Sequence, residues 1–130
     1  MKTGIIASCW DLLHPGHVSA LRYASERCDH LIAAFHTFPP HKNVLVQLVS
    51  ERFLQLQACK YVDEIVVYQH EHELETLLIA LAPSVRFLGE DYKDRNDFTG
   101  SDLDIDIEII PRGHGWSSSE LKHRISKFNS

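Results

Sequence analysis

Residues 3–19 read TGIIASCWDLLHPGHVS, and this stretch decides the class of fold. Its apolar beginning, at residues 3–8, predicts a short buried strand. Pro15 can occupy the first turn of a helix, where its missing N–H costs nothing, and apolar residues then recur at helical spacing to about Cys28. The stretch therefore reads as a strand, a polar turn and a helix in immediate succession.

The same alternation continues along the rest of the chain. Further strands are predicted at residues 30–36, 63–68, 85–88 and 103–109, the last with isoleucines alternating with acids and one wet face. Helices are predicted from Ser50, over residues 71–82, and from the S-x-x-E capping box at Ser117, with Leu121, Ile125 and Phe128 at helical spacing. Alternating strands and helices predict a single α/β domain over residues 1–130, a doubly wound parallel sheet of about five strands with helices on both faces.

Charge and cysteine content argue against several classes of protein. The 130 residues include 13 basic and 18 acidic side chains, and a net charge of −5 argues against a nucleic-acid partner. No apolar run approaches the roughly 18 residues that span a bilayer, so no membrane partner is expected. Three cysteines without CxxC spacing predict reduced thiols in a cytoplasmic protein. The His-Glu-His-Glu cluster at residues 70–73 is interpreted as a helix start rather than a metal site.

Three polar motifs directly follow predicted strands. They are SCWDLLHPGH at residues 8–17, GEDY at residues 89–92 and PRGHGWSSS at residues 111–119. In an open parallel sheet, ligands bind outside the carboxyl ends of the strands. The three motifs are therefore predicted to meet at one edge of the sheet and to form one site.

The first motif has the chemistry of a phosphate site. His14 and His17 stand three residues apart at a predicted helix start, so their rings fall on one side of the helix. The helix N-terminus attracts anions, and Gly16 would let a phosphate approach the backbone. A chance helix start and a metal pair are the alternatives, although no third metal ligand has a suitable spacing.

The third motif predicts a second phosphate cradle. Ser117, Ser118 and Ser119 offer hydroxyls and free amides at another helix N-terminus, and Arg112 can bind phosphate in a bidentate manner. An ordinary helix cap needs only one serine, and a single arginine is more often a surface residue. Lys42, after a double proline, could reach a triphosphate or an acceptor.

These motifs, with KYVDEIVVY at residues 60–68, resemble the HxGH nucleotidyltransferase superfamily. Within it they are most similar to the cytidylyltransferases, especially the group that acts on glycerol 3-phosphate. The resemblance implies a Rossmann-like fold, commonly dimeric, that uses a nucleoside triphosphate with Mg²⁺. An acceptor phosphate attacks the α-phosphorus and pyrophosphate leaves. Because a phosphate monoester is largely ionised near neutral pH, the protein needs only to position reactants and stabilise charge.

The resemblance also implies roles for individual residues. The residues expected to be catalytic are His14, His17, Lys42 and Arg112. The residues expected to bind the nucleotide are Cys9, Trp10, His14, Gly16, His17, Lys60, Gly89, Asp91, Arg112, Gly115, Trp116, Ser117, Ser118 and Ser119. Asp11 and Lys42 are expected at the acceptor, and Mg²⁺ is expected to arrive on the triphosphate without protein ligands.

CTP with glycerol 3-phosphate or a related polyol phosphate is the expected substrate pair, and two alternatives are open. Ser8 and Trp10 depart from the G-[TC]-F-D pattern of the cytidylyltransferases, and the helix after Tyr68 is acidic where the glycerol-phosphate group carries a lysine. Other features instead resemble adenylyltransferases that activate heptose phosphate. They are Cys9, HPGHVS at residues 14–19, GEDYK at residues 89–93 and the Gly-Ser pair at residues 100–101. Arg112 favours CTP over ATP. A nucleotide-binding module that has lost catalysis is the other alternative.

Overall fold

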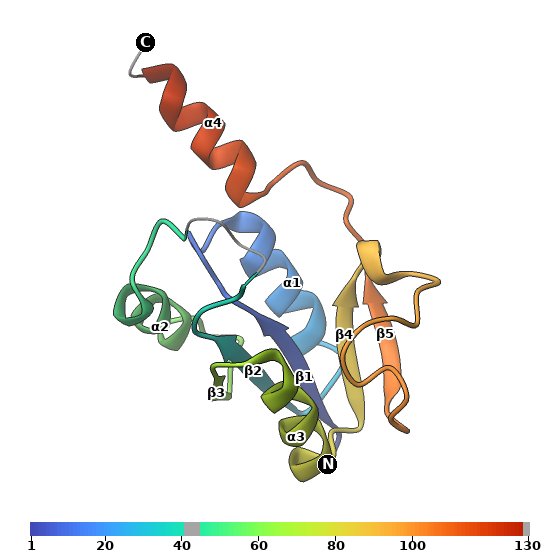
Figure 1. Cartoon of the computed structure of the whole chain (residues 1–130). Coiled ribbons are helices and arrows are strands. Elements are labelled where there is room, and N and C mark those ends of the chain that lie inside the picture. Colours follow the sequence, from blue (N-terminus) through green and yellow to red (C-terminus); the bar gives the residue numbers. More distant parts are fainter. Residues whose placement is uncertain (41–44, 129–130) are drawn as a thin grey trace.

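The structure is a computed structural model that describes residues 1–40 and 45–128. Its five strands form one parallel sheet in the order β3-β2-β1-β4-β5. The strands are β1 (Thr3–Ser8), β2 (His30–His36), β3 (Glu64–Tyr68), β4 (Val85–Gly89) and β5 (Asp106–Ile110) (Figure 1). The chain runs outward from β1 to β3 and then returns to the other side of β1. The carboxyl ends of β1 and β4 therefore flank the topological switch point, where ligands bind in such sheets.

Helices cover both faces of this sheet. They are α1 (Pro15–Ser25), α2 (Val49–Gln57), α3 (Glu71–Leu81) and α4 (Ser118–Phe128), with a short 3₁₀ turn, η1 (Glu90–Tyr92). One buried cluster joins the sheet to Leu21 of α1 and Leu56 of α2. A second cluster, on the opposite face, contains Leu74 and Leu78 of α3. The predicted doubly wound, Rossmann-like α/β domain is confirmed.

The last strand differs from its prediction. β5 begins at Asp106, and residues 99–104 form turns around Gly100, whose φ of +80° lies in the left-handed region. The side chain of Ile107 is exposed, whereas Glu108 is half-buried and forms an ion pair with Arg27 at 3.3 Å. The alternation of isoleucines and acids therefore identified the strand but not its start or its wet face, because an edge strand meets solvent and neighbours along both faces.

The last helix also differs from its prediction. α4 starts where the capping box indicated, because the Glu120 amide donates to the Ser117 hydroxyl at 3.0 Å. Its apolar stripe is not buried: Ile125 is 56% exposed and Phe128 is 89% exposed. Figure 1 shows α4 leaving the body of the domain. Helical spacing therefore predicted the helix, whereas it could not establish a packing partner for the stripe. No helix in the described part of the chain has the length and apolarity to cross a membrane.

Candidate functional site

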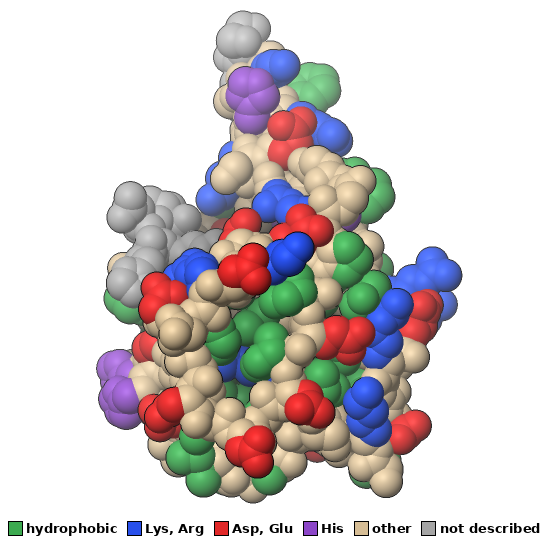
Figure 2. Space-filling view, turned by 90° about the vertical axis from the view of Figure 1, so that its right-hand side faces the viewer, with side chains coloured by type: hydrophobic (Ala, Val, Ile, Leu, Met, Phe, Trp, Pro, Cys, Tyr) green, Lys and Arg blue, Asp and Glu red, His purple; other side chains and the backbone are tan. Residues whose placement is uncertain are grey.

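A cavity of about 590 Å³ lies over the carboxyl ends of β1 and β4. The three motifs that follow β1, β4 and β5 all contribute to its lining, as the sequence predicted. The lining residues from these motifs include Cys9, Trp10, His14, Gly16, His17, Gly89, Asp91, Arg112, Trp116, Ser117, Ser118 and Ser119. Figure 2 shows a hollow with hydrophobic walls, and acidic and basic side chains around it.

The N-terminus of α1 fixes two histidine rings in one arrangement. His14 is the N-cap residue, and its Nδ1 accepts a hydrogen bond from the Gly16 amide at 3.0 Å. The Nδ1 of His17 accepts from the His14 amide at 3.3 Å, and the two rings stack with centroids 3.9 Å apart. A nitrogen that accepts a hydrogen bond carries no proton, so each neutral ring holds its proton on Nε2. The backbone therefore selects the tautomer of both rings.

The environment of His14 favours its neutral form. The residue is only 8% exposed, and burial lowers the pKa of its imidazole, with smaller contributions from the positive charges of His114 and Arg112. Trp10 lies in the core beside this pair, with its indole N–H donating to the Ala34 carbonyl at 3.2 Å. Its ring centroid is 5.5 Å from that of His17. The histidine pair therefore rests on buried, hydrogen-bonded structure.

Glycine is required at position 16 because the His14 ring leaves no room for a side chain, and not only because a ligand needs the space. A Cβ at this position would lie 2.7 Å from Cε1 of His14 and 3.1 Å from the carbonyl oxygen of Trp116. Two chain segments that lie far apart in the sequence thus approach each other where Gly16 has no side chain. Any larger residue must displace the ring, the carbonyl or both.

The segment before α4 forms the opposite wall of the cavity. Arg112 is exposed and donates to the Trp116 carbonyl at 3.5 Å. His114, which the sequence interpretation missed, accepts from the Trp116 amide at 3.1 Å and stacks on the Trp116 ring with centroids 4.8 Å apart. Ser117 caps α4, and the Ser118 hydroxyl donates to the Asp11 carbonyl at 3.0 Å. Two of the three predicted phosphate-binding serines therefore also hold the segment in place.

Several predicted site residues lie away from the cavity lining. Asp11, expected at the acceptor, is buried, and its carboxylate accepts from the amides of Val46 and Gln47 at 3.1 and 3.0 Å. Lys60, expected at the nucleotide, is exposed beyond the end of α2 and lies over the Tyr61 ring at 5.3 Å. Gly115 is likewise outside the lining. Lys42 lies outside the described residues.

The positions of Asp11 and Lys60 outside the cavity lining have simple physical causes. A carboxylate that follows a strand can bind a ligand or the amides of a neighbouring loop, and both Asp11 oxygens are used by the loop. Lys60 would need α2 to continue, but the helix ends at Gln57 and the following turn points the lysine to solvent. Motif position predicted the neighbourhood of these residues but not the direction of their side chains.

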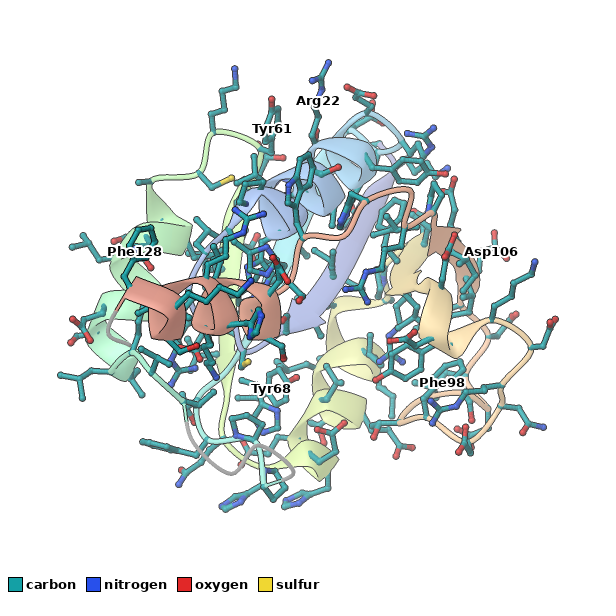
Figure 3. The ribbon with its side chains drawn as sticks, turned by 90° about the horizontal axis from the view of Figure 1, so that it is seen from above. Arg22, Tyr61, Tyr68, Phe98, Asp106 and Phe128 are labelled. Carbon is teal, nitrogen blue, oxygen red and sulfur yellow. The ribbon has the colours of Figure 1, made fainter. Side chains whose placement is uncertain are left out.

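A polar group on the α3 side of the cavity was also missed. It consists of His36 at the end of β2, Tyr68 at the end of β3, Glu71 at the start of α3, Arg86 on β4 and Thr99. Figure 3, a view from above, labels Tyr68 and also Phe98, another lining residue. An arginine inside a four-residue apolar strand was the available sequence signal, because a charge is rarely buried without a partner.

Arg52 supports the site from below. Its guanidinium is buried and donates to the carbonyl oxygens of Cys9, His36 and Thr37 at 2.9, 3.1 and 2.6 Å. These bonds tie the carboxyl ends of β1 and β2 to α2. Among the described residues there is no group of three or more His, Cys, Asp or Glu side chains placed to hold a metal ion. The expectation that Mg²⁺ enters on the triphosphate remains a prediction.

This combination defines a class of protein. A helix N-terminus with two oriented imidazoles, and a second helix start with hydroxyls and an arginine, face one cavity at the switch point of a parallel sheet. Such an arrangement can bind several phosphate groups and stabilise negative charge that develops between them. The fold is that of a Rossmann-like α/β domain, and its cavity is lined by groups that can bind phosphate.

Comparison with known proteins identifies the family. Residues 5–124 match the Cytidylyltransferase-like family, and the chain belongs to it. The bifunctional protein HldE of Caulobacter vibrioides is 36% identical over 99% of this chain, and that of Granulibacter bethesdensis is 30% identical over 97%. The chain spans about a quarter of the length of these curated relatives. The predicted membership of the HxGH nucleotidyltransferases is confirmed.

Solved structures agree with the fold. A lipopolysaccharide core biosynthesis protein from Thermoplasma volcanium matches with a TM-score of 0.71 and 21% identity, covering 89% of this chain and 99% of its own. Pantothenate synthetase from Thermus thermophilus matches with a TM-score of 0.65 and 16% identity, covering 97% of this chain and 64% of its own. At these identities the likeness establishes the architecture alone.

Proposed function

We propose that the protein transfers AMP from ATP to the phosphate of a phosphorylated sugar, with release of pyrophosphate. The curated relatives favour this sugar-phosphate adenylyltransferase alternative over a glycerol-phosphate cytidylyltransferase. The sequence supports the same choice through Cys9, HPGHVS at residues 14–19 and GEDYK at residues 89–93. The family membership supports nucleotidyl transfer itself.

The observation that carries the proposal is the fixed pair of imidazoles at the start of α1. In the reaction, an oxygen of the acceptor phosphate forms a bond to the α-phosphorus, and the bond from that phosphorus to the bridging oxygen of pyrophosphate breaks. The Nε2–H groups of His14 and His17 would donate to phosphoryl oxygens as charge builds on them. No proton has to leave the nucleophile, so these residues act by binding and orientation.

The opposite wall would hold the rest of the triphosphate. Arg112 and the start of α4, with Ser117 and Ser119, line the cavity and would bind the phosphates. Mg²⁺ would enter on the triphosphate, because it retains several waters and binds substrate phosphates in preference to an all-protein cage. It would neutralise charge on the leaving pyrophosphate.

CTP with glycerol 3-phosphate is the second candidate. It is favoured by Arg112, which lines the cavity and matches the arginine of the cytidylyltransferase motif that the sequence resembles. The acidic start of α3 speaks against it, because the glycerol-phosphate group that the sequence resembles carries a lysine on this helix.

Assembly as a homodimer, which the sequence resemblance implies, is also a proposal.

Pyrophosphate release with Mg²⁺ tests this function. ATP and CTP are each paired with heptose 1-phosphate and with glycerol 3-phosphate, and nucleotide binding is measured in parallel by calorimetry. Release with ATP and heptose 1-phosphate is the expected result. Release restricted to CTP and glycerol 3-phosphate would replace it with the second candidate. Nucleotide binding without release in any pair would overturn the adenylyltransferase proposal for these acceptors and favour a binding module.

A further inference from the structure

The cavity extends beyond the phosphate-binding elements. In the proposed function the histidine pair binds the reacting phosphates, and the segment before α4 borders one side of the cavity. The other side lies between the sheet and α3, and its walls belong to none of the three motifs that follow β1, β4 and β5. A transfer between two substrates needs room on both sides of the reacting phosphorus, so this second side requires an occupant.

A chain of polar contacts crosses this second side. Arg86 donates to the carbonyl oxygen of Thr99, and the Thr99 hydroxyl donates to Glu71 Oε1 at 2.9 Å. Glu71 Oε2 lies 3.6 Å from Nδ1 of His36, whose Nε2 donates to the Gln69 carbonyl at 3.1 Å. The contacts join β4, the loop after η1, α3 and the end of β2. The hydrogen bonds of this chain orient Arg86, Thr99 and the half-exposed Glu71 toward one another.

Arg86 is the strongest indication of a ligand. It is only 5% exposed, and burial lowers the pKa of its guanidinium. The described residues place no carboxylate within ion-pair distance of it, and its hydrogen bond to Thr99 uses one of five N–H groups. Its guanidinium carbon lies 5.4 Å from the centre of the Phe98 ring. Arg86 lines the cavity, so its other N–H groups can donate hydrogen bonds to a ligand there.

We propose that this side is an acceptor pocket for the hydroxyl-rich body of a sugar phosphate, with Arg86 and Glu71 as its specificity-determining residues. The acceptor pocket is defined by His36, Tyr68, Glu71, Arg86, Phe98 and Thr99. This inference rests on the proposed function and deepens it. The phosphate of the acceptor lies toward His14, and the sugar body extends toward α3.

The chemistry of the pocket matches a polyol ring. Arg86 only donates hydrogen bonds and an ionised Glu71 only accepts them, whereas each sugar hydroxyl can do both. Burial, reinforced by the charge of Glu71, raises the pKa of Tyr68, so its hydroxyl stays protonated and adds a donor. Phe98 supplies an apolar surface for the carbon face of the ring. Glycerol 3-phosphate, with only two hydroxyls, would leave most of these groups unpaired.

Two variants and two controls separate this role from general damage. Arg86→Met removes the buried donors with little change in volume, and Glu71→Gln removes the acceptor charge. Arg95→Met and Glu75→Gln are the matched controls, because Arg95 lies exposed in the loop after η1 and Glu75 lies exposed one turn later on α3. Far-ultraviolet circular dichroism and thermal unfolding establish that each variant is folded, and Arg86→Lys replaces Arg86→Met if the latter unfolds.

The expected result is a change confined to the acceptor. The KM for heptose 1-phosphate should rise about 10- to 100-fold in Arg86→Met and Glu71→Gln, while the KM for ATP stays within about twofold. The preference for heptose 1-phosphate over glycerol 3-phosphate should narrow by a similar factor. Both control variants should match the parent protein.

The outcomes distinguish this inference from the proposed function. If the parent protein transfers AMP to heptose 1-phosphate but both variants keep its acceptor KM, the acceptor pocket is wrong and the function stands. An equal rise in the KM for ATP would make the group part of the nucleotide site and would also overturn the inference. Calorimetric titration of heptose 1-phosphate into the protein with a non-hydrolysable ATP analogue gives a second readout. The acceptor affinity should fall in the variants, and unchanged affinity would contradict the pocket.

Discussion

The two helix starts that face the cavity, those of α1 and α4, are each capped by a side chain but are held very differently. At α1, the capping residue His14 is buried, stacked on His17 and hydrogen-bonded within its own turn. At α4, the capping residue Ser117 is half-buried, and the helix that follows has no buried residue. A capping motif predicts where a helix begins, whereas burial decides how firmly that beginning is held.

This difference assigns the two starts different tasks. Stabilising charge in a transition state requires donors placed to within a fraction of an ångström, and the α1 start is built in that way. The α4 start contacts the body of the domain through the bond from Ser118 to the Asp11 carbonyl. We expect the α1 start to set the catalytic rate and the α4 start to set the affinity for the nucleotide.

The largest expected effect comes from His14. His14→Ala should lower kcat about 100- to 1000-fold, because one oriented donor to the developing charge is lost. It should also cost about 1 kcal/mol of stability through the missing cap. His14→Asn is the informative partner, because asparagine caps helices well and keeps the stability. If His14→Asn restores both kcat and stability, His14 is a cap and not a catalytic group.

A smaller loss is expected from Gly16→Ala. The added Cβ would lie 2.7 Å from the His14 ring, and a displacement of about 1 Å in a positioned group can cost about 100-fold in rate. Gly113→Ala is the control, because a Cβ there meets no atom within 4 Å. Steady-state kinetics of the two variants measures the difference. Equal rates would show that the position of the His14 ring has no influence on catalysis.

Ser118→Ala should act on the α4 start alone. Loss of its hydrogen bond to the Asp11 carbonyl should cost about 1 kcal/mol, so the KM for ATP should rise roughly fivefold with kcat nearly unchanged. Ser126→Ala removes a comparable hydroxyl-to-carbonyl bond farther along α4 and should leave both constants unaltered. A fall in kcat with unchanged KM would reverse the division of tasks between the two starts.

The smallest effect concerns stability below neutral pH. Because the pKa of His14 is lowered from its ordinary value of 6.5, the unfolded chain takes up a proton that the native ring resists. The free energy of unfolding should therefore fall as the pH drops below 6.5 and be unaffected by this ring above it. Urea unfolding at pH 7.5 and 5.5 should show a smaller fall for His14→Asn than for the parent protein. His123→Asn, on the exposed face of α4, is the control and should behave like the parent.

The sequence predicted correctly those elements whose local pattern of residues agrees with their packing in the fold. Buried strands such as β2 and the cap at Ser117 were predictable because short apolar runs and capping motifs act over a few residues. The inward side chains of His36 and Arg86 were not, since they become neighbours only when β2 and β4 lie on either side of β1. The exposure of Phe128 and the use of Asp11 by a neighbouring loop likewise depend on contacts between distant segments.

The hydrogen bond between Ser118 and Asp11 has a consequence for the order of folding. It joins residues 107 positions apart, whereas the bonds that shape the α1 start span two and three positions. Local contacts cost little loop-closure entropy and form early, while long-range contacts wait until the chain between them is organised. The histidine pair is thus expected to acquire its geometry soon after β1 and α1 are made. The segment before α4, which forms the opposite wall of the cavity, is expected to fold last. A chain that ends before this segment would therefore have the histidine pair at the start of α1 but lack one wall of the cavity.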